Sequence, residues 1–465
     1  MTTSFAALEP AVEAHLDATR DARLASYLDF VRIPSISALP EHAEDCRRAA
    51  VWLADTLRAA GIEHVEVVES GGHPLVYGDW LHAEGAPTIL VYGHYDVQPV
   101  DPLDQWTSPP FEPVVVGERL LGRGSSDDKS NIHIHVMATA AMLAVRGGLP
   151  LNVKFLFEGE EESTSIHLDP WLAANRERLA ADLVVISDTG FFEGNIPAIT
   201  TGLRGMMYAQ VDVQGSPVDL HSGGYGGVVE NPANALARMI AALKGPDGRV
   251  LIPGFYDDVV ALTDADRSAF AALPFDEAEH ARTIGVPTLV GEVGFTALER
   301  RGGRPTLDVN GIWGGFQGEG SKTIIPATAH AKISCRLVTA QDPDRIFELF
   351  RDFLGSISPP GVTTTVTSLG GGRPSLTPID HPATQAAARG LAATFGEPPV
   401  YIREGGSIPV GASFETTLGL PVVLYGFPPP NDNAHAPDEW MDLGNYEAGI
   451  RAVVRIWEEL ASLPR

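Results

Sequence analysis

The sequence predicts an α/β fold, in which a mixed sheet carries helices on both faces and is interrupted by a smaller inserted α+β domain. Short apolar runs without polar alternation, typical of strands buried on both faces, alternate with helical stretches in the first part of the chain. Strands in the middle of the chain instead alternate apolar and polar residues, which is typical of a sheet with one face in water.

The buried strands are predicted from apolar runs rich in branched and aromatic side chains. They are Thr88–Tyr92, Val153–Phe157, Leu183–Ile186 and Val422–Tyr425. Helices are predicted where apolar residues recur at intervals of three and four. They span Ala25–Ile33, Ala43–Ala60, Ile132–Val145, Trp171–Leu179, Pro382–Phe395 and Tyr446–Leu460.

The middle of the chain contributes further elements, and these define the inserted domain. Its alternating strands and its helices are Met207–Val213, Asn234–Leu243, Ala329–Val338, Arg345–Ile357 and Val362–Thr367. Because buried strands and helices return after this stretch, we expect a catalytic domain formed by residues 1–203 and 377–465, with residues 204–376 inserted into it.

Composition excludes several classes of function. The 465 residues include 33 Lys and Arg against 60 Asp and Glu, a net charge of −27, which disfavours nucleic acid and anionic membranes as partners. No apolar stretch is long enough to cross a membrane, and the N-terminal residues lack the basic start and apolar run of a secretory signal. Cys46 and Cys335 lie in no metal or disulfide pattern, so we expect a cytoplasmic protein.

Acidic and imidazole side chains follow the predicted buried strands. Gly93 to Asp96 follow the first strand, Glu158 to Glu162 the second, Ser187 and Asp188 the third, and a Pro-rich loop reaching His435 the fourth. The stretch Gly122 to Lys129 opens the helix that begins near Ile132. Since ligands bind outside the carboxyl ends of strands in such sheets, we expect these groups to meet in one crevice.

A crevice with this many carboxylates needs cations to neutralise it. Two imidazoles and three carboxylates, without thiolate, suit two Zn²⁺ ions, with Mn²⁺ or Co²⁺ as substitutes, bridged by one carboxylate and one water. From spacing alone, either Asp127 or Asp128 can bridge, and the run Glu160–Glu162 admits more than one register. His133 and His135 diverge from each other on a predicted helix, and we interpret them as structural.

Seven motifs in order resemble the M20 metallopeptidases, most closely the cytosolic non-specific dipeptidase and carnosinase branch. They are GHYDVQP, GRGSSDDKS, EGEEES, ISD, DLHSGGYGG, REGGSIPV and NDNAH. The resemblance extends from about Ser35 to the C-terminal helix. It implies a di-zinc catalytic domain interrupted by a lid domain that also mediates dimerisation.

The resemblance also implies roles for individual residues. Asp127 corresponds to the bridging carboxylate, joined in the family to the next residue by a cis peptide. His94 and Asp188 correspond to ligands of one metal, and Glu162 and His435 to ligands of the other.

The remaining roles are catalytic or concern the substrate. Glu161 resembles the general base and later acid, and Asp96 the carboxylate that fixes the imidazole of the first metal ligand. His221 resembles the group that stabilises the oxyanion, reaching the active site of the partner subunit. The residues that resemble contacts to the substrate backbone and terminal carboxylate are Thr323, Arg336 and Ser407.

We therefore expect a homodimeric metallohydrolase that cleaves dipeptides or similar small amides through a metal-bridging hydroxide, with Glu161 as general base. One alternative is an M20-type deacylase of N-acyl, N-succinyl or N-carbamoyl amino acids. Another is a metal-dependent binding protein that kept the fold without catalysis. Hydrolysis of dipeptides beside acyl amino acids distinguishes the three.

Overall fold

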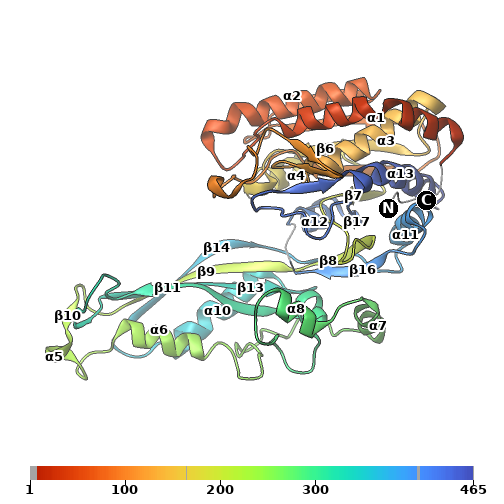
Figure 1. The fold of residues 1–465 in the computed structure, drawn as a ribbon. Coiled ribbons are helices and arrows are strands. Elements are labelled where there is room, and N and C mark those ends of the chain that lie inside the picture. The colour runs from red at the N-terminus through yellow and green to blue at the C-terminus, as the bar shows by residue number, and fades with distance from the viewer. Residues whose placement is uncertain (1–7, 164, 406–408, 464–465) are drawn as a thin grey trace. The chain divides into compact units, whose positions relative to one another are not determined.

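The computed structural model describes residues 8–163, 165–405 and 409–463, and it divides into two compact units (Figure 1). The first unit contains residues 1–201, 377–402 and 413–465, and the second contains residues 202–376 and 403–412. The predicted inserted domain, residues 204–376, begins two residues later than the second unit and lacks the short segment 403–412.

The first unit is built on a mixed sheet whose strands run in the order β1-β2-β6-β3-β7-β17-β8. In chain order the strands are β1 Glu63–Val68, β2 Leu75–Trp80, β3 Thr88–His94, β6 Asn152–Glu158, β7 Leu183–Ile186, β8 Ala198–Leu203 and β17 Val422–Tyr425. The neighbours β6, β3, β7 and β17 are parallel, whereas β1, β2 and β8 join antiparallel. The predicted α/β class with a mixed sheet is confirmed.

Burial explains why the central strands carry no polar alternation. Every residue of β6 and β7 is buried, and in β3 only Thr88 is partly exposed. The helices of this unit are α1 Pro10–Val31, α2 Ala43–Ala59, α3 Lys129–Arg146, α4 Leu168–Ala174, α11 Pro382–Phe395 and α13 Leu443–Ala461. Because α3 packs against α1, α13 and β3, even its polar residues Ser130, His133 and His135 are buried.

Shorter elements complete the first unit. A small sheet in the order β18-β5-β4 joins β4 Val114–Val116, β5 Arg119–Leu121 and β18 Trp440–Asp442. The helical turns are η1 Pro40–His42, η2 Leu103–Gln105, η3 Glu161–Ser163 and η4 Phe414–Leu418. Of the remaining short elements, β15 Ser375–Leu376 belongs to the second unit, and β16 Val400–Glu404 and α12 Pro409–Ser413 each cross the boundary between the units in the sequence.

The second unit contains an antiparallel sheet in the order β11-β13-β9-β14. Its strands are β9 Gly205–Gln214, β11 Thr306–Gly314, β13 Thr328–Leu337 and β14 Thr363–Gly372, and β10 Leu220–His221 pairs with β12 Ile324–Ile325. Alternate residues of β9 and β13 are buried against α6 Pro232–Ala241 and α10 Pro343–Ile357. The predicted strands with one polar face are therefore present here.

Several elements were not predicted. Among them are β1, β2, β8, β11 and β16, the first turns of α1, and the helices α5 Ser222–Tyr225, α7 Asp264–Ala272, α8 Glu277–Thr283 and α9 Ala297–Gly303. The expected helix Trp171–Leu179 is observed as α4, shifted toward the N-terminus and ending at Ala174. Among the described residues, none of the helices combines the length and the apolar character that a membrane span requires.

Candidate metal centre and active site

The parallel strands of the first unit deliver their polar residues to one edge of the sheet. His94, the last residue of β3, stands opposite Glu158 of β6, and Tyr92 stands opposite Ile186 of β7. Asp188 therefore follows β7 at the same edge, and β17 lies parallel to β7 on its other side and leads into the loop with His435. The fold thus gathers groups that lie far apart in the sequence.

A glycine allows β3 to approach the loop that carries the acidic pair. A Cβ atom at Gly93 would lie 2.7 Å from Oδ2 of Asp128 and 2.8 Å from Cγ1 of Ile132. Both distances are shorter than the van der Waals contacts that a Cβ atom makes in proteins. Glycine therefore permits the close packing of His94 against the start of α3.

Two groups of potential ligand atoms meet at this edge. Nε2 of His94 lies 3.0 Å from Oδ1 of Asp127 and 3.5 Å from Oδ1 of Asp188. Nε2 of His435 lies 2.9 Å from Oδ2 of Asp127 and 3.2 Å from Oε1 of Glu162. Within each group the ligand atoms lie within 4.8 Å of one another, and Asp127 belongs to both groups.

The chemistry of these donors fits two divalent cations that share one carboxylate. Each group offers one imidazole nitrogen and two carboxylates, a set that Zn²⁺ accepts. Neither cysteine belongs to a group, and both are buried. The side chain of His94 is 1% exposed, whereas that of His435 is 55% exposed, so one group is closed and the other opens to solvent.

The charges of the cluster act strongly on one another. Burial raises the pKa of Asp188 to about 6, whereas hydrogen bonds to Asp127 and Glu162 raise the pKa of His435 to about 10. Burial opposes ionisation of Asp127, yet its hydrogen bonds to His435 and His94 hold its pKa well below the ordinary value. The cluster therefore holds Asp127 as a carboxylate between two imidazole groups.

The two candidate bridging residues have different partners. The carboxylate of Asp127 contacts both histidines. That of Asp128 is fully buried, accepts from the main-chain N–H of His94 at 3.2 Å and accepts from Nδ2 of Asn131 at 2.8 Å. A cis peptide bond joins the two aspartates. Asp127 alone of the pair is directed at both imidazoles.

The three glutamates of the acidic run also differ in their partners. Glu160 bonds to Nδ1 of His167 at 2.8 Å, and Glu162 accepts from Nε2 of Gln98 at 2.8 Å besides contacting His435. Among the described residues, no hydrogen bond or ion pair engages the carboxylate of Glu161. Burial raises the pKa of Glu161 well above its ordinary value, and the negative charges of Asp188 and Glu162 act in the same direction.

Asp96 connects the first histidine with the acidic run. Nδ1 of His94 lies 3.1 Å from the main-chain oxygen of Asp96 and 3.4 Å from its carboxylate. The same carboxylate accepts from the main-chain N–H groups of Glu161 and Glu162 at 3.3 and 3.0 Å. One buried side chain therefore orients an imidazole and fixes the turn η3.

Other predicted residues lie in the second unit. His221 and Thr323 are neighbours there, because His221 pairs with Ile324 and the main-chain N–H of Ser222 donates to the oxygen of Thr323 at 3.1 Å. Arg336 lies on the partly exposed face of β13, opposite Thr306. Ser407 lies outside the described residues.

The hydrogen bonding of His221 fixes its neutral tautomer. Nδ1 of this exposed ring accepts from the main-chain N–H of Gly223 at 2.9 Å. The proton of the neutral ring must then reside on Nε2. Nε2 is therefore a hydrogen-bond donor.

Two residues of the site were missed at the level of sequence. Gln98 contacts Glu162, and Glu439 supports the loop that carries Asp127. The Glu439 carboxylate is fully buried and accepts from the main-chain N–H groups of Gly124, Ser126 and Asp127 at 2.9 to 3.0 Å. Their positions could have pointed to them, because Gln98 lies inside the motif GHYDVQP and Glu439 lies four residues after His435.

His133 and His135 lie apart from both ligand groups, in agreement with the structural interpretation. His133 bonds to the hydroxyl groups of Tyr446 at 2.7 Å and Ser26 at 3.1 Å. His135 bonds to the hydroxyl group of Ser187 at 2.8 Å. Both are buried in α3.

Comparison with known proteins identifies the family of the chain. The profile of peptidase family M20/M25/M40 matches residues 90–459. The chain belongs to this family. The predicted M20 membership is thus confirmed. The protein is a hydrolase of a family of metal-dependent peptidases.

Individual M20 relatives match most of the chain. The Cys-Gly metallodipeptidase dug1 of Schizosaccharomyces pombe is 32% identical over 84% of this chain and 83% of its own. The Beta-Ala-His dipeptidase of Homo sapiens is 30% identical over 98% of this chain and 94% of its own.

A solved structure shows the same fold. The M20 family metallo-carboxypeptidase Sso-CP2 of Sulfolobus solfataricus is 32% identical, with a TM-score of 0.85 over 95% of this chain and 99% of its own.

Proposed function

We propose that this M20 protein is a two-metal dipeptidase that hydrolyses dipeptides or similarly small peptide-like amides. The observation that carries the proposal is the pair of three-residue groups sharing Asp127, beside a carboxylate, Glu161, that has no partner among the described residues. The similarity to the dug1 and Beta-Ala-His dipeptidases supports dipeptides as the substrate class.

In this proposal His94 and Asp188 would hold one Zn²⁺, Glu162 and His435 would hold the second, and Asp127 would contribute to both. Mn²⁺ or Co²⁺ can take the same donors. When bound, such a pair of cations polarises a carbonyl oxygen and makes water more acidic. Asp96 keeps His94 in the orientation that presents Nε2 to the cluster, and Gln98 does the same for Glu162.

Glu161 serves as the group that moves the proton. Its carboxylate stands in the turn η3, held through the main chain by Asp96. Because no described side chain binds it, it can take a proton from the attacking water and return it to the leaving amine. The role of general base and acid therefore falls to Glu161 rather than to Glu160, which is bonded to His167.

The second unit supplies contacts to the substrate in this proposal. His221 donates from Nε2 to the oxyanion, acting in the site of the partner subunit of a homodimer. Arg336, Thr323 and Ser407 bind the substrate backbone and its terminal carboxylate, and residues 204–376 act as a lid. The two buried free cysteines accord with a cytoplasmic location.

The test is metal analysis paired with a substrate panel on the purified protein. We expect two zinc ions per chain and cleavage of unblocked dipeptides. The panel also contains N-blocked dipeptides and N-acetyl, N-succinyl and N-carbamoyl amino acids. A preference for the N-blocked dipeptides would show that the protein is a carboxypeptidase. A preference for the acyl amino acids would show that it is the alternative deacylase.

Replacing Glu161 tests the proton-transfer role separately. Glu161→Gln should retain both metal ions and lower kcat by about 10²-fold to 10⁴-fold, the range of general acid–base catalysis. Glu160→Gln serves as the matched control, because it changes the neighbouring carboxylate that is bonded to His167. Near-normal turnover by Glu161→Gln with the metals in place would rule out the assigned role.

A further inference from the structure

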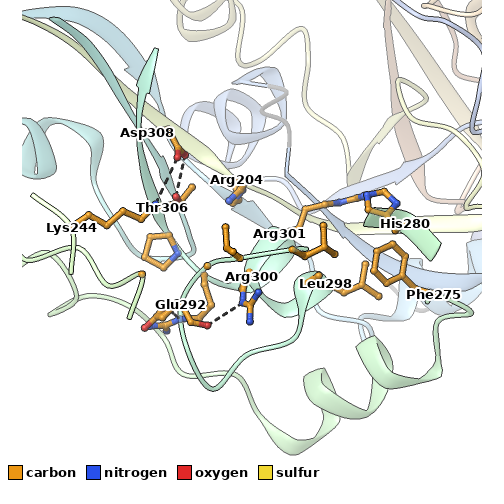
Figure 2. A pocket seen from close by; sticks show the side chains of 17 residues that line it. Arg204, Lys244, Phe275, His280, Glu292, Leu298, Arg300, Arg301, Thr306 and Asp308 are labelled. Atoms are coloured by element: carbon orange, nitrogen blue, oxygen red, sulfur yellow. Dashed lines mark hydrogen bonds and ion pairs between the residues drawn. The ribbon is translucent and has the colours of Figure 1, made fainter. Parts of the chain in front are cut away.

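A cavity lies entirely within the second unit, and none of the residues of the candidate metal centre line it. It has a volume of about 360 Å³ and is formed by α8, α9, the start of β11 and the loop before α9 (Figure 2). Because its lining comes from one unit, its geometry is independent of the first. This volume matches a small organic molecule.

The lining is positively charged in a strongly acidic protein. Five permanent cations line the cavity, namely Arg204, Lys244, Arg300, Arg301 and Arg304. The carboxylates in the lining are Glu292 and Asp308, which leaves an excess of 5 − 2 = 3 positive charges in a chain of net charge −27. A local field of this sign attracts anions.

The acidic residues of the lining do not neutralise this excess. Glu292 is 6% exposed and already accepts two hydrogen bonds of 2.8 Å from Arg304, with Arg249 at 3.2 Å. Arg300 donates to the main-chain oxygen of Glu292, and no ion pair joins it to a carboxylate of any described residue. Lys244 donates to a main-chain oxygen at 3.1 Å and lies 3.8 Å from Asp308.

Two further cations crowd the same region. Arg301 pairs with Glu404 at 3.1 Å, and Figure 2 shows Arg204 between Arg301 and Asp308. Burial and the positive charges of Arg336 and Arg301 lower the pKa of Arg204 to about 10. A bound anion would relieve this repulsion.

Apolar side chains also line the cavity. Phe275 and Leu298 line the cavity together with Ala297 and Pro305, and Leu298 is 8% exposed. We propose that this cavity, here called the arginine pocket, binds a small organic carboxylate, with its head on Arg300 and Lys244 and its apolar body against Phe275 and Leu298. Guanidinium groups recognise carboxylates through paired hydrogen bonds, which favours this class of ligand.

Isothermal titration calorimetry of the full-length, zinc-loaded protein tests the proposal, with 4-phenylbutyrate as the probe. The paired probes are 4-phenylbutyramide, which lacks the charge, and inorganic phosphate, which lacks the apolar body. We expect 4-phenylbutyrate to bind at least tenfold more tightly than either. Equal binding of the amide or of phosphate would overturn the proposed ligand class.

Variants locate the binding. Arg300→Gln should weaken 4-phenylbutyrate binding by roughly tenfold or more, and adding Lys244→Gln should weaken it further. Arg238→Gln is the matched control, since this exposed arginine of α6 lies outside the pocket and pairs with Glu230. Lys244→Gln alone provides a second pocket variant if Arg300→Gln does not fold.

Two results would place the carboxylate elsewhere. Unchanged affinity in both folded pocket variants would overturn the arginine pocket. Loss of affinity in Asp127→Ala would show that the probe binds at the metal centre instead. Unchanged affinity in Asp127→Ala, with weakened binding in Arg300→Gln, is the expected pattern.

Discussion

The two sheets of this molecule present polar residues in different ways. In the first unit the central strands are buried on both faces, so polar side chains occur where the strands end, as at His94 and Asp188. In the second unit each strand has one buried and one partly exposed face, so polar side chains such as Arg336 occur along the strand. The first arrangement concentrates charge at a point, and the second spreads it over a surface.

The largest effect is expected from removing the carboxylate shared by both ligand groups. Asp127→Ala takes one ligand from each group, so we expect loss of bound zinc and a fall in kcat/KM on the order of 10³-fold or more. Mass spectrometry of the metal content and dipeptide turnover measure the two effects. Asp29→Ala, which removes an exposed carboxylate of the same unit, is the control. Full metal content in Asp127→Ala would contradict the shared role.

A residue of the second unit should affect turnover but not metal content. His221→Ala removes the proposed donor to the oxyanion, and we expect kcat to fall by about 10²-fold to 10³-fold with zinc content unchanged. If the histidine acts across a dimer, mixing His221→Ala chains with Glu161→Gln chains should restore part of the activity. No recovery from mixtures shown to contain hybrid dimers would contradict action across the interface.

A substitution of Glu439 tests whether the hydrogen bonds that support the loop carrying Asp127 contribute to zinc affinity in addition to the metal ligands. Glu439→Gln replaces an acceptor of three main-chain N–H groups around Asp127, so zinc affinity should fall by about 10-fold to 100-fold. Competition with a chromogenic chelator measures this affinity. Glu447→Gln is the control, because it breaks a largely buried ion pair with Arg23 and should lower stability without changing zinc affinity. Equal zinc affinity in both variants would refute the positioning role.

The smallest effect concerns the buried histidines of α3. Burial lowers the pKa of His133 and of His135 to about 3, against an ordinary value of about 6.5. As pH falls below about 6.5 the unfolded chain binds protons that the folded chain excludes, so stability declines until about pH 3. At about pH 5 the loss is roughly 2 kcal/mol for each histidine.

Denaturant unfolding of the metal-free protein at several pH values measures this dependence. His135→Gln should show a shallower loss of stability between about pH 6.5 and 5 than the wild type, and His133→Gln likewise. Parallel pH profiles for wild type and both variants would contradict the assignment.

The sequence predicted those parts of the molecule whose physical signal is local. Apolar runs without polar alternation predict β3, β6, β7 and β17, because strands buried on both faces carry few polar residues, Lys154 of β6 being one. The strand ends then predict a cluster of acids and imidazoles, and the structure brings His94, Asp127 and His435 within ligand distance of their neighbours. The catalytic and ligand roles themselves stay predictions.

The remaining features depend on contacts between distant residues. Spacing could not separate Asp127 from Asp128, because the distinction lies in the contacts of Asp128 with Asn131 and the main chain of His94. Glu439 was missed because its partners lie more than 300 residues earlier in the chain. The stretch with α7, α8 and α9 was missed because each of these short helices has a single buried apolar side chain, Phe270, Ala281 and Leu298, too few to set a periodicity.

The dependence of the centre on both ends of the chain affects its biosynthesis. His435 and Glu439 contact the loop of residues 123–127, and β17 completes the sheet beside β7. A ribosome must therefore translate the chain as far as His435 before the second ligand group exists. A nascent chain that has not reached His435, or one clipped before it, would lack the second ligand group.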